Sequence, residues 1–202
     1  MQAWNHELFL LINASAQPGE PALIAARFLA SGLVVAAAAL MVALWIWARR
    51  IDRAALLSVA CGIAVALGLN QVLGMLWYEP RPFMIGLGHS FMSHQVENSF
   101  PSDHGSFMWS MAFGLLATRA SRSWGWIACL AALAVSWARI YLGVHFPVDM
   151  LASLLIGIVG ATVARLASPF LARRVMPIAG RLYEGALDAL HLSPVLFPRR
   201  AR

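Results

Sequence analysis

Lysine is absent from this chain of 202 residues, and charged residues of all kinds make up only 12% of it. Soluble domains carry about a quarter charged residues, so this scarcity argues against a soluble protein. Apolar residues amount to 60% of the chain and the mean hydropathy is +0.71, values typical of integral membrane proteins. We therefore expect the bilayer, and not water, to be the main solvent of this protein.

Cysteine, signal-like segments and linkers are also scarce. Cys61 and Cys129 both lie in apolar runs, which favours buried packing thiols over a disulfide or a metal pair. The first fifteen residues lack a basic segment and are interrupted by polar residues such as Asn5 and Glu7, so we expect no removable signal peptide. No repeat or low-complexity tract divides the chain, which predicts one membrane domain over residues 1–202.

Charge-free apolar runs predict the membrane-spanning helices, since about 20 apolar residues cross a hydrocarbon core of about 30 Å. The runs 28–48 and 54–78 are long enough, whereas 105–118, 123–138 and 150–164 cover only about 21–24 Å. Each short run lies beside His104, Arg139 or Asp149. We predict an all-α, polytopic membrane helical bundle of five spans, with these three residues recessed below one membrane face.

Arginine placement predicts the orientation, because short cytoplasmic loops are rich in basic residues. Twelve of the fifteen arginines fall between the first two spans, between the third and fourth, or after the fifth: Arg49, Arg50, Arg53, Arg119, Arg122, Arg165, Arg173, Arg174, Arg181, Arg199, Arg200 and Arg202. These segments, including a tail from 171 to 202, are predicted to be cytoplasmic. The loop 79–103 and the loop around His145 then face the opposite, extracytoplasmic side.

Two end segments are too short or too polar to span the membrane. Residues 4–12 are predicted to form an interfacial or re-entrant helix, and residues 181–192 a second helix on the cytoplasmic surface.

Three polar segments converge on the extracytoplasmic side: 79–82, 101–104 and 139–149. Arg81 and Arg139 supply planar, permanently charged groups that can hold one phosphoryl group between them. Ser102 precedes an apolar run as a helix N-cap would, so it can cap the helix, bind the phosphate, or do both. These residues predict a binding site for a phosphate-shaped anion.

Two histidines complete this candidate site. His145 and Asp149 are four residues apart around Pro147, which favours the first turn of a helix and lets the carboxylate orient the imidazole. We interpret His145 as a nucleophile, Asp149 as its partner, and His104 as a general acid.

The remaining polar residues have weaker claims to a function. Ionisable groups in membrane helices are costly and usually functional, although some serve only as helix-to-helix contacts. We expect four loop residues to be solvated: His6, His89, His94 and Glu97. Three residues of the spans are expected to form helix-to-helix contacts, with lining of the site as the alternative: Arg27, Asn70 and Gln71.

These motifs resemble those of the type 2 phosphatidic acid phosphatase superfamily, which read Lys-x6-Arg-Pro, Pro-Ser-Gly-His and Ser-Arg-x5-His-x3-Asp. The resemblance covers about residues 57–166 and matches Arg81-Pro82, the segment 101–104 and the segment 139–149. It implies a phosphohistidine on His145, catalysis without metal or other cofactor, and phosphate contacts from Arg81, Ser102, Asp103 and Arg139.

Three positions depart from the family pattern: Gly74 stands at the lysine, Asp103 at the glycine before the histidine, and Ala138 at the serine. The carboxylate of Asp103 must point away from the phosphate or pair with an arginine. The sequence 99–105 with 80–83 is similar to the bacitracin-resistance, BcrC-type branch. That branch converts undecaprenyl pyrophosphate into the monophosphate, which recycles the carrier lipid of cell-wall synthesis.

The resemblance therefore implies an undecaprenyl-diphosphatase of the bacterial inner membrane with a periplasmic site and a polyprenyl pyrophosphate substrate. Within the same class, phosphatidic acid, phosphatidylglycerol phosphate or a lipopolysaccharide phosphate are alternative substrates. A lipid-binding or flipping protein without catalysis is an alternative of another class. Nucleic-acid binding is not indicated despite a pI of about 10.6, because the arginines follow membrane topology.

Overall fold

The computed structural model of the chain describes residues 3–47, 50–118, 122–193 and 197. Every regular element within these ranges is helical, which confirms the predicted all-α class. The helices are α1 (Ala3–Ile12), α2 (Glu20–Arg27), the π-helix η1 (Phe28–Gly32), α3 (Leu33–Trp47), α4 (Arg50–Leu76), the 3₁₀ helix η2 (Pro82–Ile85), α5 (Asp103–Leu116), α6 (Arg122–Tyr141), α7 (Pro147–Phe170), the π-helix η4 (Leu171–Val175) and α8 (Met176–Ala189).

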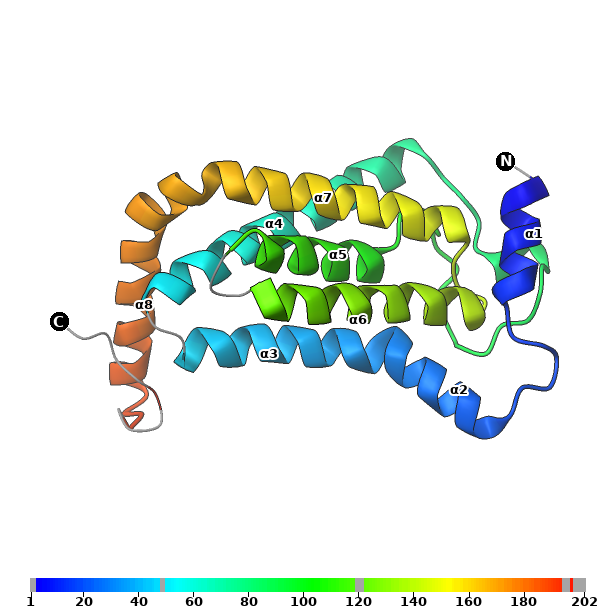
Figure 1. Cartoon of the computed structure of the whole chain (residues 1–202), viewed down its shortest axis with the longest axis horizontal. Helices are drawn as coiled ribbons and strands as arrows, with labels where there is room; N and C mark the ends of the chain where they lie inside the picture. Colours follow the sequence, from blue (N-terminus) through cyan, green and yellow to red (C-terminus); the bar gives the residue numbers. More distant parts are fainter. Residues whose placement is uncertain (1–2, 48–49, 119–121, 194–196, 198–202) are drawn as a thin grey trace.

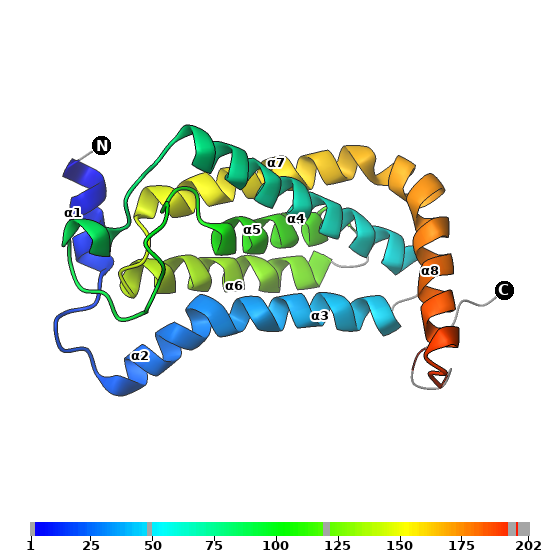
Figure 2. The ribbon, with the colours of Figure 1, turned by 180° about the vertical axis from the view of Figure 1, so that it is seen from behind.

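Helix α5 forms the centre of the bundle, with α4, α6 and α7 packed around it and α3 lying beside α6 (Figures 1 and 2). Small residues let the helices approach closely, as is common where helices pack in membranes. A Cβ added to Gly157 of α7 would lie 2.5 Å from the Trp109 Cβ of α5, and one added to Gly160 would lie 2.5 Å from the Gly62 carbonyl oxygen of α4. These contacts fix α7 against both neighbours.

Within the described part of the chain, four helical segments are long and apolar enough to cross a membrane: Glu20–Trp47, Arg53–Leu76, Arg122–Tyr141 and Pro147–Ala189. The predicted span 105–118 corresponds to α5, which has 14 residues and lies in the centre of the bundle.

The prediction that the last two spans are short is wrong, because the helices that form them are longer than the charge-free runs. Helix α6 has 20 residues and α7 has 24, because Arg139 and Asp149 lie inside the helices instead of ending them. Both side chains are almost fully buried within the protein, at 1% exposure each, and bond to neighbouring residues there.

The predicted helix at residues 4–12 is confirmed as α1, and it packs against the start of α7. The side-chain oxygen of Asn5 accepts a hydrogen bond of 3.2 Å from the Val148 amide, one of the free N–H groups at the start of α7. The rings of His6 and Phe9 contact the ring of Phe146. The expectation that His6 lies in a solvated loop is therefore wrong.

Arg53 connects helices at the end of the bundle far from α1, where α8 crosses the other helices (Figure 1). This buried guanidinium donates hydrogen bonds of 2.8 Å to the carbonyl oxygens of Trp45 and Ile46, at the end of α3. Its central carbon also lies 4.8 Å from the ring centroid of Tyr183 in α8. One arginine thus joins α3, α4 and α8.

The other described arginines assigned to the cytoplasm follow the same division. The ends of α3, α5 and α7 and the starts of α4 and α6 all lie toward α8, away from α1 (Figures 1 and 2). Arg49, Arg119, Arg199, Arg200 and Arg202 lie outside the described residues.

Candidate active site

A polar cavity of about 220 Å³ lies where α4 ends and α5 begins, at the end of the bundle opposite α8. It receives residues from all three sequence motifs. Its lining consists of Asn70, Gln71, Gly74, Arg81, His94, Glu97, Asn98, Phe100, Pro101, Asp103, His104, Arg139 and His145.

The backbone turn of η2 positions Arg81, which precedes Pro82 as the N-cap of that short helix. Pro82 has a fixed φ that suits the first helical position. The Nη1 atom of Arg81 donates a 3.0 Å hydrogen bond to the Val144 carbonyl and lies 3.1 Å from His145 Nε2. Its Nη2 atom donates to Glu97 Oε1 and to the Asn98 carbonyl, both at 3.1 Å.

Arg139 reaches the same imidazole from the end of α6. Its Nη2 atom lies 3.4 Å from His145 Nε2 and 3.2 Å from His94 Nε2. Its Nη1 atom donates a 3.2 Å bond to the carbonyl of Ala30, in the π-helix η1. A π-helix departs from the regular α-helical bonding pattern and is frequent at functional sites, and here it brings a backbone acceptor to Arg139.

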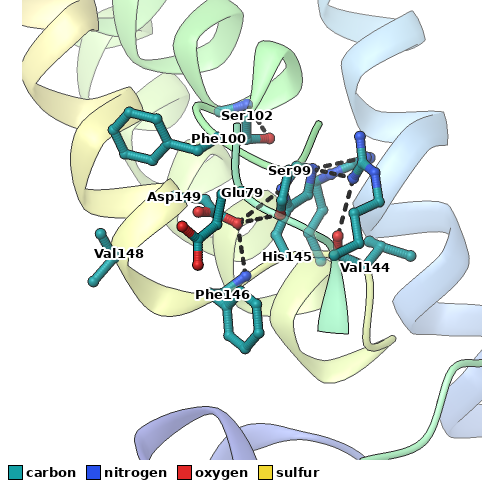
Figure 3. A network of polar contacts seen from close by, with 12 residues as sticks. Glu79, Ser99, Phe100, Ser102, Val144, His145, Phe146, Val148 and Asp149 are labelled. Atoms are coloured by element: carbon teal, nitrogen blue, oxygen red, sulfur yellow. Dashed lines mark hydrogen bonds and ion pairs between the residues drawn. The ribbon is translucent and has the colours of Figure 1, made fainter. Parts of the chain in front are cut away.

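The other ring nitrogen of His145 faces Asp149, which confirms the predicted pairing. Nδ1 lies 3.2 Å from Asp149 Oδ2. The same carboxylate oxygen accepts hydrogen bonds from the Phe146 amide at 2.8 Å and from the Ser99 hydroxyl at 2.5 Å, as Figure 3 shows. Since an anionic carboxylate only accepts, Nδ1 carries the proton and Nε2 presents its lone pair toward the two arginines.

The helix start at Ser102 is also confirmed. Ser102 is the N-cap of α5, and its hydroxyl accepts a bond from the Gly105 amide at 3.4 Å. The side chain is fully buried and does not line the cavity, so the structure supports the capping role.

Asp103 does line the cavity, and an amide holds its carboxylate. Asn70 Nδ2 donates a 2.7 Å bond to Asp103 Oδ1, while Asn70 Oδ1 accepts a 3.0 Å bond from the Ser106 hydroxyl. The Asp103 carboxylate thus has an asparagine as its hydrogen-bond partner, a contact that the sequence did not indicate.

Burial and the two guanidiniums together disfavour the charged form of the histidines at the cavity. Burial, followed by the charge of Arg139, lowers the pKa of His104 to about 4. Burial and both arginines also lower the pKa of His145 well below its usual 6.5. Burial lowers the pKa of Arg81, but from so high a value that the group remains charged. Without an anion, both imidazoles are therefore neutral near pH 7.

Two residues that seemed weak in the sequence belong to the site. His94 and Glu97 line the cavity and contact Arg139 and Arg81. The expectation of a solvated residue is wrong for His94, whose side chain is 18% exposed, whereas the Glu97 side chain is 50% exposed and contacts Arg81 from the solvent side. Asn70 and Gln71 also line it, which the sequence allowed only as an alternative. His89 is exposed, as expected.

Neither Ser99 nor Ala30 received a role from the sequence patterns. Ser99 had one usable signal, since it stands three residues before Ser102 in the segment that resembles the BcrC-type branch. The Ala30 carbonyl had none, because a backbone contact across 109 residues leaves no side-chain pattern.

Comparisons with known proteins agree with the motifs. A family model described as the PAP2 superfamily matches residues 55–173. The putative undecaprenyl-diphosphatase YbjG of Escherichia coli (strain K12) is 36% identical over 163 residues, which is 80% of this chain and 81% of that protein. Undecaprenyl-diphosphatase BcrC of Bacillus subtilis (strain 168) is 27% identical over 191 residues, 94% of this chain and 97% of that protein.

A solved structure has a similar fold. The crystal structure of Aquifex aeolicus LpxE superposes with a TM-score of 0.68 at 26% identity, covering 81% of this chain and 95% of that one.

Proposed function

Since this chain belongs to the PAP2 superfamily and is a membrane hydrolase, we propose that it converts undecaprenyl diphosphate into undecaprenyl phosphate and inorganic phosphate. The names of its relatives YbjG and BcrC support this substrate. The observation that carries the proposal is the pair of guanidiniums that flank one lone pair of a buried imidazole.

Arg81 and Arg139 bind the terminal phosphoryl group in this proposal. Both have an Nη atom within 3.4 Å of His145 Nε2, so an oxygen of a phosphoryl group held by them lies close to the attacking nitrogen. The Nε atoms of both arginines are buried without a hydrogen-bond partner among the described residues. Buried donors of this kind are costly, and a phosphate oxygen is a suitable acceptor for them.

His145 attacks the terminal phosphorus through Nε2, and the bond from phosphorus to the bridging oxygen breaks. Asp149 stabilises the positive charge that develops on the imidazole, and His104 donates a proton to the departing lipid phosphate. Water then attacks the phosphohistidine, with His104 accepting the water proton, and releases inorganic phosphate. Each histidine thus returns to its starting state.

The acid role of His104 depends on the substrate itself. In the empty cavity its pKa is about 4, so it holds no proton near neutral pH. A phosphate dianion between Arg81 and Arg139 cancels much of their positive field, and the pKa rises. Substrate binding therefore charges the general acid at the place where its proton is required.

The orientation follows from the ends of the bundle. Arg122, Arg173, Arg174 and Arg181 lie toward α8, and the cavity lies at the other end. Under the positive-inside rule these arginines support a cytoplasmic position for the α8 end and an extracytoplasmic position for the site. The membrane that we propose is the bacterial inner membrane.

The deciding experiment compares purified protein on undecaprenyl diphosphate, phosphatidic acid, phosphatidylglycerol phosphate and a lipopolysaccharide phosphate. We expect undecaprenyl diphosphate to have the highest kcat/KM, and phosphate release to persist in EDTA. Preference for a monophosphate lipid would contradict the substrate, and loss of activity in EDTA would contradict catalysis without metal.

Two variants test the mechanism against a lipid-binding protein without catalysis. His145→Ala and His104→Ala are expected to abolish turnover while undecaprenyl diphosphate still binds. Labelled phosphate should be trapped on the wild-type protein and not on His145→Ala. Full turnover by His145→Ala would contradict the phosphohistidine.

A further inference from the structure

His94 comes from the loop between η2 and α5, and the proposed chemistry does not use it. Its side chain is mostly buried, with 18% exposure, and lines the cavity together with Arg81 and Arg139. Its ring packs edge-on to that of His145, with centroids 6.4 Å apart. A loop residue thus stands beside the attacking imidazole.

The contacts of His94 define its protonation state in the empty site. Its Nε2 atom lies 3.2 Å from Arg139 Nη2, and a guanidinium can only donate, so Nε2 is the acceptor. The proton of the neutral ring is then on Nδ1, which is buried without a hydrogen-bond partner among the described residues. Glu97 Oε1 lies 3.4 Å away, at the distance of an ion pair.

Arg139 Nη2 is shared between two imidazoles. It lies 3.2 Å from Nε2 of His94 and 3.4 Å from Nε2 of His145. An anion that binds this Nη2 group next to His145 therefore also meets the Nε2 edge of His94. Glu97 pairs with Arg81 Nη2 at 3.1 Å and completes a group of charges around the same space.

We propose that His94 is a phosphate-binding residue of this site. When phosphate enters, Arg139 Nη2 turns from His94 Nε2 to a phosphate oxygen. Nε2 takes up a proton from the buffered solvent and donates the new N–H to the phosphate, while Nδ1–H turns to Glu97. This inference deepens the proposed function and rests on it, because it assumes that the cavity binds phosphate.

The electrostatics of the cavity support this switch. In the empty site burial, Arg81 and Arg139 lower the pKa of His94, and Glu97 raises it in part. A phosphate dianion counteracts the two arginines and favours the charged ring. The other titratable groups that face this space are His104 and Asp103 from α5 and His145 from the loop after α6.

Inorganic phosphate, titrated calorimetrically into the purified full-length protein, tests the inference without depending on the lipid. His94→Ala is expected to weaken phosphate binding about tenfold, the value of one charge-assisted hydrogen bond. His94→Lys, which keeps a cation, should restore most of the affinity. The matched control is His89→Ala, a histidine of the same loop that does not line the cavity.

Proton uptake separates a phosphate contact from a structural role. In buffers of different ionisation enthalpy near neutral pH, the wild type should take up more protons per bound phosphate than His94→Ala or His94→Gln. Equal affinity and equal proton uptake in wild type and His94→Ala would overturn the inference, as would an equal loss in His89→Ala. If the wild type itself does not bind phosphate, the proposed function fails first.

Discussion

The Ser99 hydroxyl lies 2.5 Å from Asp149 Oδ2 and 3.3 Å from His145 Nδ1, so a serine of the loop before α5 holds both members of the His–Asp pair. All three side chains are buried. Because Asp149 Oδ2 also accepts from the Phe146 amide, its position is fixed by three donors from two segments of the chain.

Ser99→Ala removes one of these donors and tests Ser99 as a positioning residue. A hydrogen bond to a buried charged group contributes about 1.5–3 kcal/mol, so we expect kcat to fall roughly ten- to a hundredfold with a smaller change in KM. Steady-state kinetics measure this split. Ser90→Ala, at an exposed serine of the same loop, is the control and should leave kcat unchanged. An unchanged kcat in Ser99→Ala would remove Ser99 from the mechanism.

Arg139→Lys keeps the positive charge but loses the planar guanidinium with its two amino groups. The guanidinium contacts the Ala30 carbonyl through one amino group and the two imidazoles through the other, which an ammonium cannot reproduce. We expect kcat/KM to fall by about ten- to a hundredfold, the effect of one lost charge-assisted bond. Arg122→Lys, at the opposite end of the bundle, should behave as wild type. Equal activity of Arg139→Lys would mean that charge alone suffices.

The pH dependence follows from the lowered pKa of His145. Its nucleophilic form is the neutral one, so activity is lost as pH falls through the pKa of the free enzyme. Since burial, Arg139 and Arg81 place that pKa below 6.5, the acid-side midpoint of kcat/KM should lie below pH 6.5. Arg81→Gln removes one positive charge and should move the midpoint upward. A wild-type midpoint above pH 6.5, or a downward shift in the variant, would contradict this electrostatic account.

Arg53→Ala tests the joint at the far end of the bundle. This side chain donates to two carbonyls at the end of α3 and stacks on Tyr183 of α8. Losing it leaves two part-buried carbonyl acceptors without this donor, so we expect the free energy of unfolding to fall by about 1–3 kcal/mol. Thermal unfolding in detergent measures the change, and kcat should stay close to wild type because the cavity is distant. A large fall in kcat without destabilisation would show that α3 and α8 act on the site.

The candidate site could be predicted where its residues form local patterns. His145 and Asp149 are four residues apart, and Ser102 precedes an apolar run, so helical spacing and capping rules identified their contacts. His94 and Glu97 had no such pattern. They come from a loop with no regular element between η2 and α5, and only its folding over the cavity brings them to the arginines.

The sequence by itself determined the membrane class, the all-helical architecture and the main residues of the candidate site, because apolar runs, arginine placement and short motifs are local properties of the chain. Tertiary structure decided which helices extend through Arg139 and Asp149, since hydrogen bonds to neighbouring residues replace the solvation that these buried charges lose. It also decided the contacts of Ser99, Ala30 and His94, which depend on the approach of segments distant in the sequence.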